Sequence, residues 1–170
     1  FYFIQVGAQD GVTGDPIRAK VLEEGWQGVL VEPRRAIFEQ LVRNYIGREG
    51  LSFFNAAICD TNGKREMFAL AAPDPSLPAW AHGLGTFDLA TLVRHEAELP
   101  GLREKVVTEE VQCRTWGSLL DEVRPSKVDL LQIDAEGMDF ELVRDFPFQR
   151  IRPGIVRYEH KLLSHGDRSA

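Results

Sequence analysis

The chain has 170 residues, of which 44% are hydrophobic and 27% charged, values typical of one globular domain with a substantial core. Its net charge of −6 argues against a nucleic-acid partner, because a protein that follows a phosphate backbone carries an excess or a stripe of Lys and Arg. The apolar runs are too short for a membrane span, and no signal peptide is evident.

A strand predicted at residues 1–6 leads into a Gly-rich turn, Gly7-Ala8-Gln9-Asp10-Gly11. Beyond the turn, Asp15 and Pro16 predict the start of a helix, with Asp15 as its N-cap. Gly25 predicts the end of that helix. The chain therefore opens with the first half of a βαβ unit.

The second strand is predicted at residues 27–31, where a Val- and Leu-rich run is typical of a strand buried on both faces. It ends on Glu32, about 20 residues beyond the turn, where a first βαβ unit places a carboxylate to accept from two ribose hydroxyls. A helix from about residue 34 and a third strand at 51–56 follow. This spacing predicts a half-site for a nucleoside.

A turn at residues 61–64 followed by a strand at 65–70 predicts a β-hairpin. Residues 71–102 are then interrupted by Pro and Gly, so no long element is expected there. A loop-rich segment of this length is either an active-site cover or an inert surface insertion, and we interpret it as a cover.

The second half contains predicted strands at 106–114, 128–133 and 154–159, and helices at 116–122 and around 141–143. The alternation predicts one domain over residues 1–170, with a doubly wound, mostly parallel α/β sheet. In such a sheet ligands bind outside the carboxyl ends of the strands. That side collects Asp10, Glu32 and Asp134.

Cys59 and Cys113 lie far apart, form no CxxC motif and have no His at metal spacing, so we interpret them as buried thiols. His95 with Glu96 and Glu98 has the spacing of neither a helical His pair nor a tetrahedral site. No metal site is therefore predicted.

Several segments together resemble the FkbM family of S-adenosylmethionine-dependent methyltransferases. They are FIQVGAQDG at 3–11, VEP at 31–33, NAAICD at 55–60, LLQIDAEGMDFELV at 130–143 and IVRYEH at 155–160. The resemblance implies a Rossmann-like class I methyltransferase fold, although the last strands of that fold are not evident in this chain. It also implies methyl transfer from S-adenosylmethionine, usually to a hydroxyl oxygen on a sugar or another natural product.

The resemblance assigns cofactor contacts to the following positions: Gly7, Ala8, Asp10, Gly11, Glu32, Pro33, Ala57 and Asp134. Asp134 is also the first catalytic candidate, and His160 is the second. Glu136 and Gly137 complete an Ile-Asp-x-Glu-Gly motif. Gln5 and Gln132 depart from the family pattern, since an acid and a Lys are frequent there. Gln5 can still reach the methionyl ammonium through its carbonyl oxygen, but without charge assistance, which puts the affinity for the cofactor in question.

Two other function classes compete with a methyltransferase. A nicotinamide-dependent oxidoreductase would require Gly where Gln9 stands, so that a pyrophosphate could approach the turn. A noncatalytic interaction module that keeps the methyltransferase fold is the main alternative. The methyltransferase interpretation predicts a small-molecule or glycan acceptor and a cytoplasmic location, and it leaves oligomeric state and metal dependence open.

Overall fold

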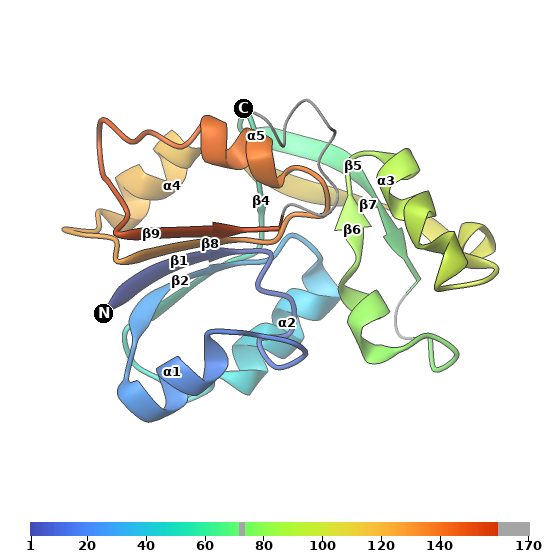
Figure 1. Cartoon of the computed structure of the whole chain (residues 1–170), viewed down its shortest axis with the longest axis horizontal. Helices are drawn as coiled ribbons and strands as arrows, with labels where there is room; N and C mark the ends of the chain where they lie inside the picture. Colours follow the sequence, from blue (N-terminus) through green and yellow to red (C-terminus); the bar gives the residue numbers. More distant parts are fainter. Residues whose placement is uncertain (72–73, 160–170) are drawn as a thin grey trace.

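The main sheet contains five parallel strands in the order β3-β2-β1-β8-β9 (Figure 1). Their bounds are β1 (Tyr2–Val6), β2 (Gln27–Val31), β3 (Leu51–Phe54), β8 (Leu130–Ile133) and β9 (Ile155–Tyr158). The computed structural model describes residues 1–71 and 74–159. Val6 stands opposite both Val31 and Ile133, so β1, β2 and β8 end at the same edge. The predicted parallel α/β sheet is confirmed.

Helices cover both faces of the main sheet, two below it and two above it in Figure 1. They are α1 (Arg18–Glu24) and α2 (Arg35–Asn44) below, and α4 (Trp116–Val123) and α5 (Asp139–Arg144) above. Successive side chains of a strand point to opposite faces. Phe3 accordingly packs in the same core as Leu41 of α2, whereas Ile4 joins the core that contains Trp116 of α4. Each face therefore buries its own core.

A smaller mixed sheet, in the order β4-β7-β5-β6, stands beyond the carboxyl ends of the main strands (Figure 1). Its strands are β4 (Ala57–Ile58), β5 (Gly63–Leu70), β6 (Gly85–Thr86) and β7 (Val106–Arg114). The predicted hairpin is wrong, because β7 lies between the two strands that the turn at 61–64 joins. β5 pairs with β7 along its whole length, from Gly63 opposite Cys113 to Leu70 opposite Val106.

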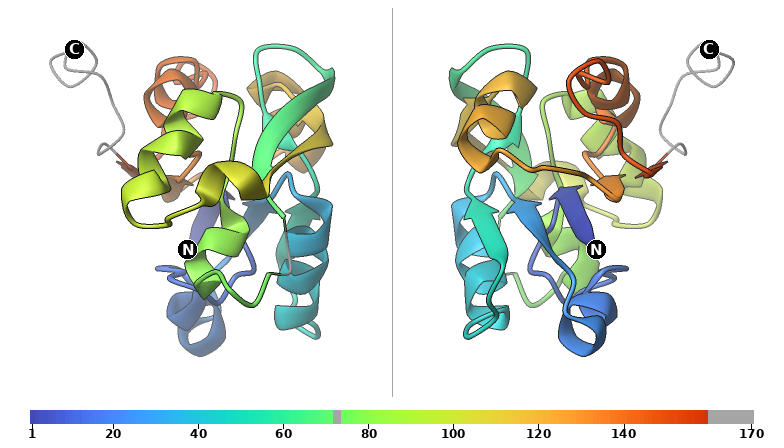
Figure 2. Two further views of the ribbon diagram at one scale, coloured as in Figure 1. Left: turned by 90° about the vertical axis from the view of Figure 1, so that its right-hand side faces the viewer. Right: turned by 90° about the vertical axis from the view of Figure 1, so that its left-hand side faces the viewer.

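The described residues of the segment between β5 and β7 form four short helices besides β6. They are η1 (Ala79–Gly83), α3 (Leu89–Val93), η2 (Arg94–Ala97) and η3 (Leu102–Lys105). Its elements are short, as the Pro and Gly residues predict. Its leucines, however, bury a separate core with Leu70, which the sequence pattern did not indicate. Figure 2 (left) shows this green and yellow segment lying across the ends of the main strands.

Asp15 does not cap α1, which begins after Ile17 with no side-chain cap. Its carboxylate instead accepts hydrogen bonds from Gln5 Nε2 at 3.1 Å, Tyr45 Oη at 2.8 Å and the Ile17 N–H at 2.8 Å. These tertiary partners on β1 and at the end of α2 replace the predicted capping role. Gly25 ends the helix as predicted, with a φ of +66°.

Cys59 and Cys113 form a disulfide, so the interpretation as buried thiols is wrong. The parallel pairing of β4 with β7 sets Ala57 opposite Cys113, and the two cysteine Cα atoms lie 5.6 Å apart. The sequence separation of 54 residues hid this proximity, which depends on strand pairing.

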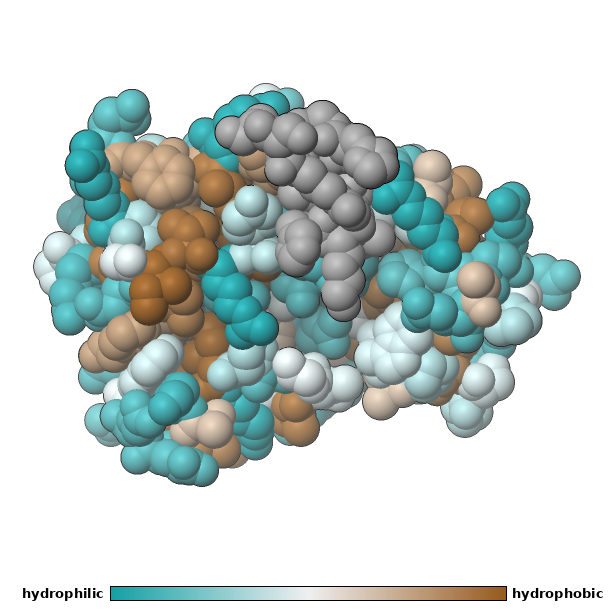
Figure 3. Space-filling view, in the orientation of Figure 1, coloured by the Kyte–Doolittle hydropathy of each residue, from teal (hydrophilic) through white to brown (hydrophobic). Residues whose placement is uncertain are grey.

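The surface differs between the two ends of the main strands. Figure 3 shows apolar surface mainly over the left half of the view, where the amino ends of the main strands lie. Phe1 and Ile155, at the amino ends of β1 and β9, are among the exposed large apolar side chains. Among the described residues, no helix has both the length and the apolar character needed to cross a membrane.

Candidate functional site

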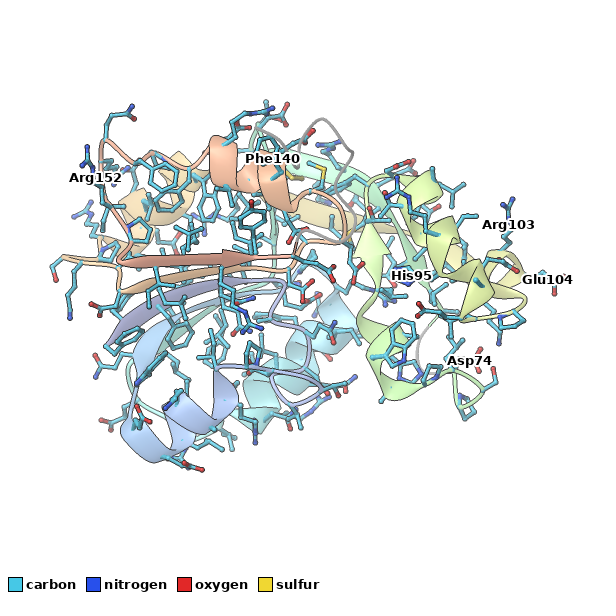
Figure 4. The ribbon with its side chains drawn as sticks, viewed as in Figure 1. Asp74, His95, Arg103, Glu104, Phe140 and Arg152 are labelled. Atoms are coloured by element: carbon cyan, nitrogen blue, oxygen red, sulfur yellow. A yellow bond between two sulfur atoms is a disulfide. The ribbon has the colours of Figure 1, made fainter. Side chains whose placement is uncertain are left out.

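Three main strands bring predicted ligand-binding residues to one edge of the sheet. Gly7 follows β1, Glu32 follows β2 and Asp134 follows β8. Because these strands are parallel and in register, the residues that follow them meet at the same edge. Figure 4 shows red oxygen atoms gathered just beyond the arrow tips. The repeated pattern of an apolar strand followed by a polar turn thus builds the site.

A hollow that we call the central cavity opens at this edge and is walled by both sheets. Five of the predicted cofactor-binding residues line it: Gly7, Glu32, Pro33, Ala57 and Asp134. Apolar side chains supply much of the remaining wall: Ile58, Met67, Phe87, Met138 and Leu142. An apolar cavity with a few converging polar groups is the usual form of a small-molecule site.

Glu32 lines the central cavity with only 2% of its surface exposed. Its Oε2 accepts the Gln9 N–H at 3.1 Å, and its Oε1 accepts the Arg34 N–H at 2.9 Å. Burial raises the pKa of Glu32 to about 7, although both hydrogen bonds and the nearby Arg34 guanidinium oppose the rise. Each carboxylate oxygen can accept a further donor. Glu32 can therefore accept from ligand hydroxyls.

Gly7 allows the backbone after β1 to lie directly against the backbone after β8. Its φ is +75°, and a Cβ at this position would lie 1.8 Å from the carbonyl oxygen of Asp134. Both the left-handed backbone and the close approach require glycine. A hydrogen bond of 3.0 Å from the Asp134 N–H to the Val6 carbonyl completes the junction.

Asp134 borders three cavities, of which the central cavity is one. Its side chain is exposed to these hollows, but the surrounding residues partly desolvate the carboxyl group. This desolvation raises the pKa of Asp134 to about 7. Repulsion from Glu136 and Glu159 raises the pKa further in the same direction. A carboxyl group that titrates near neutral pH can hold or release a proton there.

The other predicted cofactor residues lie outside the central cavity. Ala8 lines a neighbouring cavity. The Asp10 carboxylate accepts two backbone N–H groups and the Thr13 hydroxyl, at 2.7 to 2.9 Å, and so shapes the turn. A Cβ on Gly11 would lie 2.4 Å from Cε2 of Tyr45, so this glycine permits packing on α2. Cofactor contact by these residues stays a prediction.

Gln5 and Gln132 stand opposite each other on β1 and β8 and are 3% and 6% exposed. The Oε1 atom of each is buried and has no hydrogen-bond partner among the described residues. Both side chains line a hollow that we call the β1–β8 cavity, together with Ala8, Asp15 and Asp134. Buried acceptors without a partner are costly, and their usual explanation is a ligand or water that satisfies them.

Residues 5–168 match the family model described as Methyltransferase FkbM domain. The chain belongs to the FkbM methyltransferase family. The match includes both sheets, except for the first three residues of β1, and all the cavities described above. Membership of this family indicates a methyltransferase. No curated protein and no solved structure matched the chain.

In this FkbM domain the segment between β5 and β7 forms one wall of the central cavity, through Gly83 and Phe87 among others. Arg34 holds this wall in place. Its Nη2 donates to the Leu70 carbonyl at 2.7 Å, and its Nη1 donates to the carbonyls of Leu84, at 3.2 Å, and His82. Sequence reasoning missed Arg34, because an Arg at the start of a helix is ordinarily solvated.

Asp139 connects the loop after β8 with the end of β9. Its buried Oδ1 accepts the N–H groups of Ala135 and Glu159, each at 3.2 Å, and its Oδ2 accepts the Gly137 N–H at 3.3 Å. Sequence reasoning missed this residue too, since an acid in the first turn of a helix usually interacts with the helix dipole alone. The available signal was its place two residues after the Ile-Asp-x-Glu-Gly motif at 133–137.

Two further predictions concern chemistry at this edge. His160, the second catalytic candidate, lies outside the described residues, and its role stays a prediction. Within residues 1–71 and 74–159, no group of three or more His, Cys, Asp or Glu side chains has the spacing to hold a metal ion.

Proposed function

We propose that this FkbM domain transfers a methyl group from S-adenosylmethionine to a hydroxyl oxygen of a sugar or another natural product. The observation that carries the proposal is the convergence of Glu32, Asp134 and the Gln5–Gln132 pair around the turn after β1. The strand order also supports a Rossmann-like class I methyltransferase fold. The partner in the reaction is a small-molecule or glycan acceptor.

The chemistry of the groups that line the central cavity suits the adenosine part of the cofactor. The Glu32 carboxylate has acceptor capacity left for two ribose hydroxyls. Pro33 and Ala57 lie beside it, and the apolar wall around Met67 suits an adenine ring. The residues on this side therefore fit the group that we assign to them.

The β1–β8 cavity suits the methionyl ammonium. An ammonium group carries three donors and no acceptor. The unpartnered Oε1 atoms of Gln5 and Gln132 offer two acceptors, and Asp15 adds negative charge to the same cavity. A hydrogen bond from a charged donor is stronger than a neutral one, so the two amide oxygens can bind the ammonium, but without the additional charge of the acid that is frequent in the family.

When bound, S-adenosylmethionine supplies an electrophilic methyl group on its sulfonium sulfur. The task of the chain is to hold the acceptor oxygen in line with that group and to exclude water. Asp134 borders all three cavities, and Gly7 fixes its position through backbone contact. We assign Asp134 to contact with the reacting centre, with His160 as the second candidate.

The competing function classes find no support in the described residues. Gln9 has a φ of +47°, and its side chain lies so close to Gly83 that a Cβ there would be 2.4 Å from Gln9 Cδ. Gln9 also stands where the dinucleotide fingerprint requires the glycine that lets a pyrophosphate approach the turn. No observation favours a noncatalytic module.

A cytoplasmic location is part of the proposal, and the Cys59–Cys113 disulfide provides its test. Stable disulfides are rare in the cytosol. We expect rapid alkylation of intact cells followed by mass spectrometry to find these cysteines reduced if the protein resides there. A fully oxidised pair in cells would contradict the cytoplasmic location.

Calorimetric titration with S-adenosylhomocysteine tests the proposed function, with NAD as the control ligand. We expect saturable binding of S-adenosylhomocysteine alone. Glu32→Ala should weaken binding by about 1.5 to 3 kcal/mol, the range for a hydrogen bond to a charged group. Glu39→Ala, on the exposed face of α2, is the matched control and should bind normally. Equal affinity of wild type and Glu32→Ala would contradict the ribose assignment.

A further inference from the structure

A hollow that we call the acidic cavity adjoins the central cavity and shares Asp134 and Glu136 with it. Its other lining residues are Trp80, Leu84, Arg94, His95, Glu98 and Glu159. Its volume of about 400 Å³ falls in the range of small-molecule sites. A molecule in the acidic cavity would lie directly beside a ligand of the central cavity.

His95 and Glu136 face each other in the acidic cavity. His95 Nε2 lies 3.6 Å from Glu136 Oε2, and the side chains are 19% and 17% exposed. The Nε2 atom is shielded from solvent and has no hydrogen-bond partner in the described part of the chain. Figure 4 places His95 in the segment that faces the tips of β8 and β9. A proton on Nε2 that is directed at this carboxylate leaves Nδ1 as the basic nitrogen.

The backbone around Glu136 is held in an unusual conformation. Glu136 has a φ of +47°, a region that residues with a side chain rarely adopt. The Thr86 hydroxyl donates to the Glu136 carbonyl at 3.0 Å, and Asp139 accepts the Gly137 N–H at 3.3 Å. Such conformations persist only where the surroundings enforce them, often at functional sites. Here they direct Glu136 to His95.

Building on the methyl transfer proposed above, we infer that the acidic cavity holds the acceptor and that His95, oriented by Glu136, accepts the proton of the acceptor hydroxyl. The acceptor oxygen forms a bond to the methyl carbon. The bond from that carbon to sulfur breaks, and its electron pair stays on sulfur. The hydroxyl proton goes to His95, which becomes imidazolium, and Glu136 stabilises that charge. His95 is then a catalytic residue, and Glu136 is a positioning residue.

The charges of the acidic cavity disfavour anionic acceptors. Among the described residues that line it, the carboxylates, from Asp134, Glu98, Glu136 and Glu159, outnumber the basic side chains, Arg94 and His95. The Trp80 ring, whose centroid lies 5.8 Å from that of His95, adds a flat apolar wall. Negative charge repels a phosphorylated or carboxylated acceptor, while an aromatic wall suits a ring. We therefore assign a neutral or cationic ring compound that carries hydroxyl groups.

The charged groups around His95 come from three elements. Arg94 and Glu98 lie in or next to η2, Asp134 and Glu136 follow β8, and Glu159 follows β9. Glu136 raises the pKa of His95 most strongly, burial opposes the rise, and Glu98 and Glu159 add to it. Because the base must be neutral, we expect proton acceptance to strengthen as the pH rises through this raised pKa.

An NMR pH titration of the full chain, labelled with ¹³C in the His rings, tests the pairing without measuring activity. His95→Gln identifies the signal by its loss. Glu136→Gln should lower the pKa of His95, whereas Glu104→Gln, an exposed position outside the cavity, should leave it unchanged. An unchanged His95 pKa in folded Glu136→Gln would overturn the inference.

The same signal tests the acceptor class in protein saturated with S-adenosylhomocysteine. Methyl β-glucopyranoside and glucosamine should shift the His95 signal, and glucose 6-phosphate should not. A shift of the His95 signal with glucose 6-phosphate but not with the other two probes would overturn the acceptor assignment, as would no shift with any of the three. If wild-type protein fails to bind S-adenosylhomocysteine, the proposed function fails. If it binds and His95 titrates independently of Glu136, only the present inference fails.

Discussion

The guanidinium of Arg34 forms two hydrogen bonds with the carboxylate of Glu109, from Nη2 to Oε1 at 2.6 Å and from Nε to Oε2 at 3.2 Å. This fork joins the start of α2, beside the main sheet, to β7 of the smaller sheet. The remaining Arg34 donors reach carbonyls that flank the wall of the central cavity, including those of Leu70 and Leu84. The pair therefore holds the two sheets at the spacing that forms the cavity.

Arg34→Lys should lower the free energy of unfolding by about 2 to 4 kcal/mol, because one ammonium cannot replace a planar fork with five donors. Arg35→Lys is the matched control. Arg35 is the next residue, its side chain is 85% exposed, and it forms a surface ion pair with Glu39. The control should change stability by less than about 0.5 kcal/mol. Urea denaturation of both variants measures the difference. Equal effects would contradict the role of the Arg34–Glu109 pair in holding the two sheets together.

Strand positions and the edge that carries the site could be predicted, because both depend on local pattern. Apolar runs mark β1, β2 and β8, and parallel pairing then forces Gly7, Glu32 and Asp134 together. The family resemblance, which the match over residues 5–168 confirms, follows from the same segments.

Features that depend on contacts between distant segments could not be predicted. β5 pairs along its whole length with β7, more than 35 residues further along the chain, although an Asn-Gly turn suggested a closer partner. Asp15 has the pattern of a helix cap, but Gln5 and Tyr45 compete for its carboxylate. The spacing of His95 from Glu96 and Glu98 in the sequence tests only for a metal site. The partner of His95 in the structure is Glu136, which the sequence places 41 residues away in the loop after β8.

The Cys59–Cys113 disulfide should stabilise the folded state. It closes a loop with a sequence separation of 54 residues, for which restriction of the unfolded chain corresponds to about 4 kcal/mol, within a general range of roughly 0 to 5. The double variant Cys59→Ala and Cys113→Ala should therefore unfold at lower urea than the oxidised wild type. Reductant should shift the wild type toward the variant and leave the variant unaffected. A reductant-independent wild-type midpoint would contradict the prediction.

Glu32 should make stability depend on pH. Its folded pKa, about 7, lies above the ordinary value of 4.5, so between these values the folded state holds a proton that the unfolded state has released. Stability from this group is thus fully present below about pH 4.5 and is lost as the pH rises through 7. The stability advantage of wild type over Glu32→Gln should shrink by up to about 3 kcal/mol from pH 5 to pH 8. Denaturation at several pH values measures this, and a constant difference would refute it.

Gly7→Ala should damage the site through one steric contact. The new Cβ would lie 1.8 Å from the Asp134 carbonyl oxygen, so β1 and β8 must separate at the point where the cavities meet. Gly14→Ala is the matched control, because Gly14 lies in the same loop with a similar φ, +67° against +75°, but a Cβ added there would meet no atom within 4 Å. The control carries only the backbone cost, about 1 to 2 kcal/mol.

Gly7→Ala should lose more stability and, where it folds, bind S-adenosylhomocysteine at least tenfold more weakly, a loss of about 1.4 kcal/mol. Denaturation and calorimetry on the two variants measure both effects, and equal losses would show that the close approach to Asp134 is not what requires glycine.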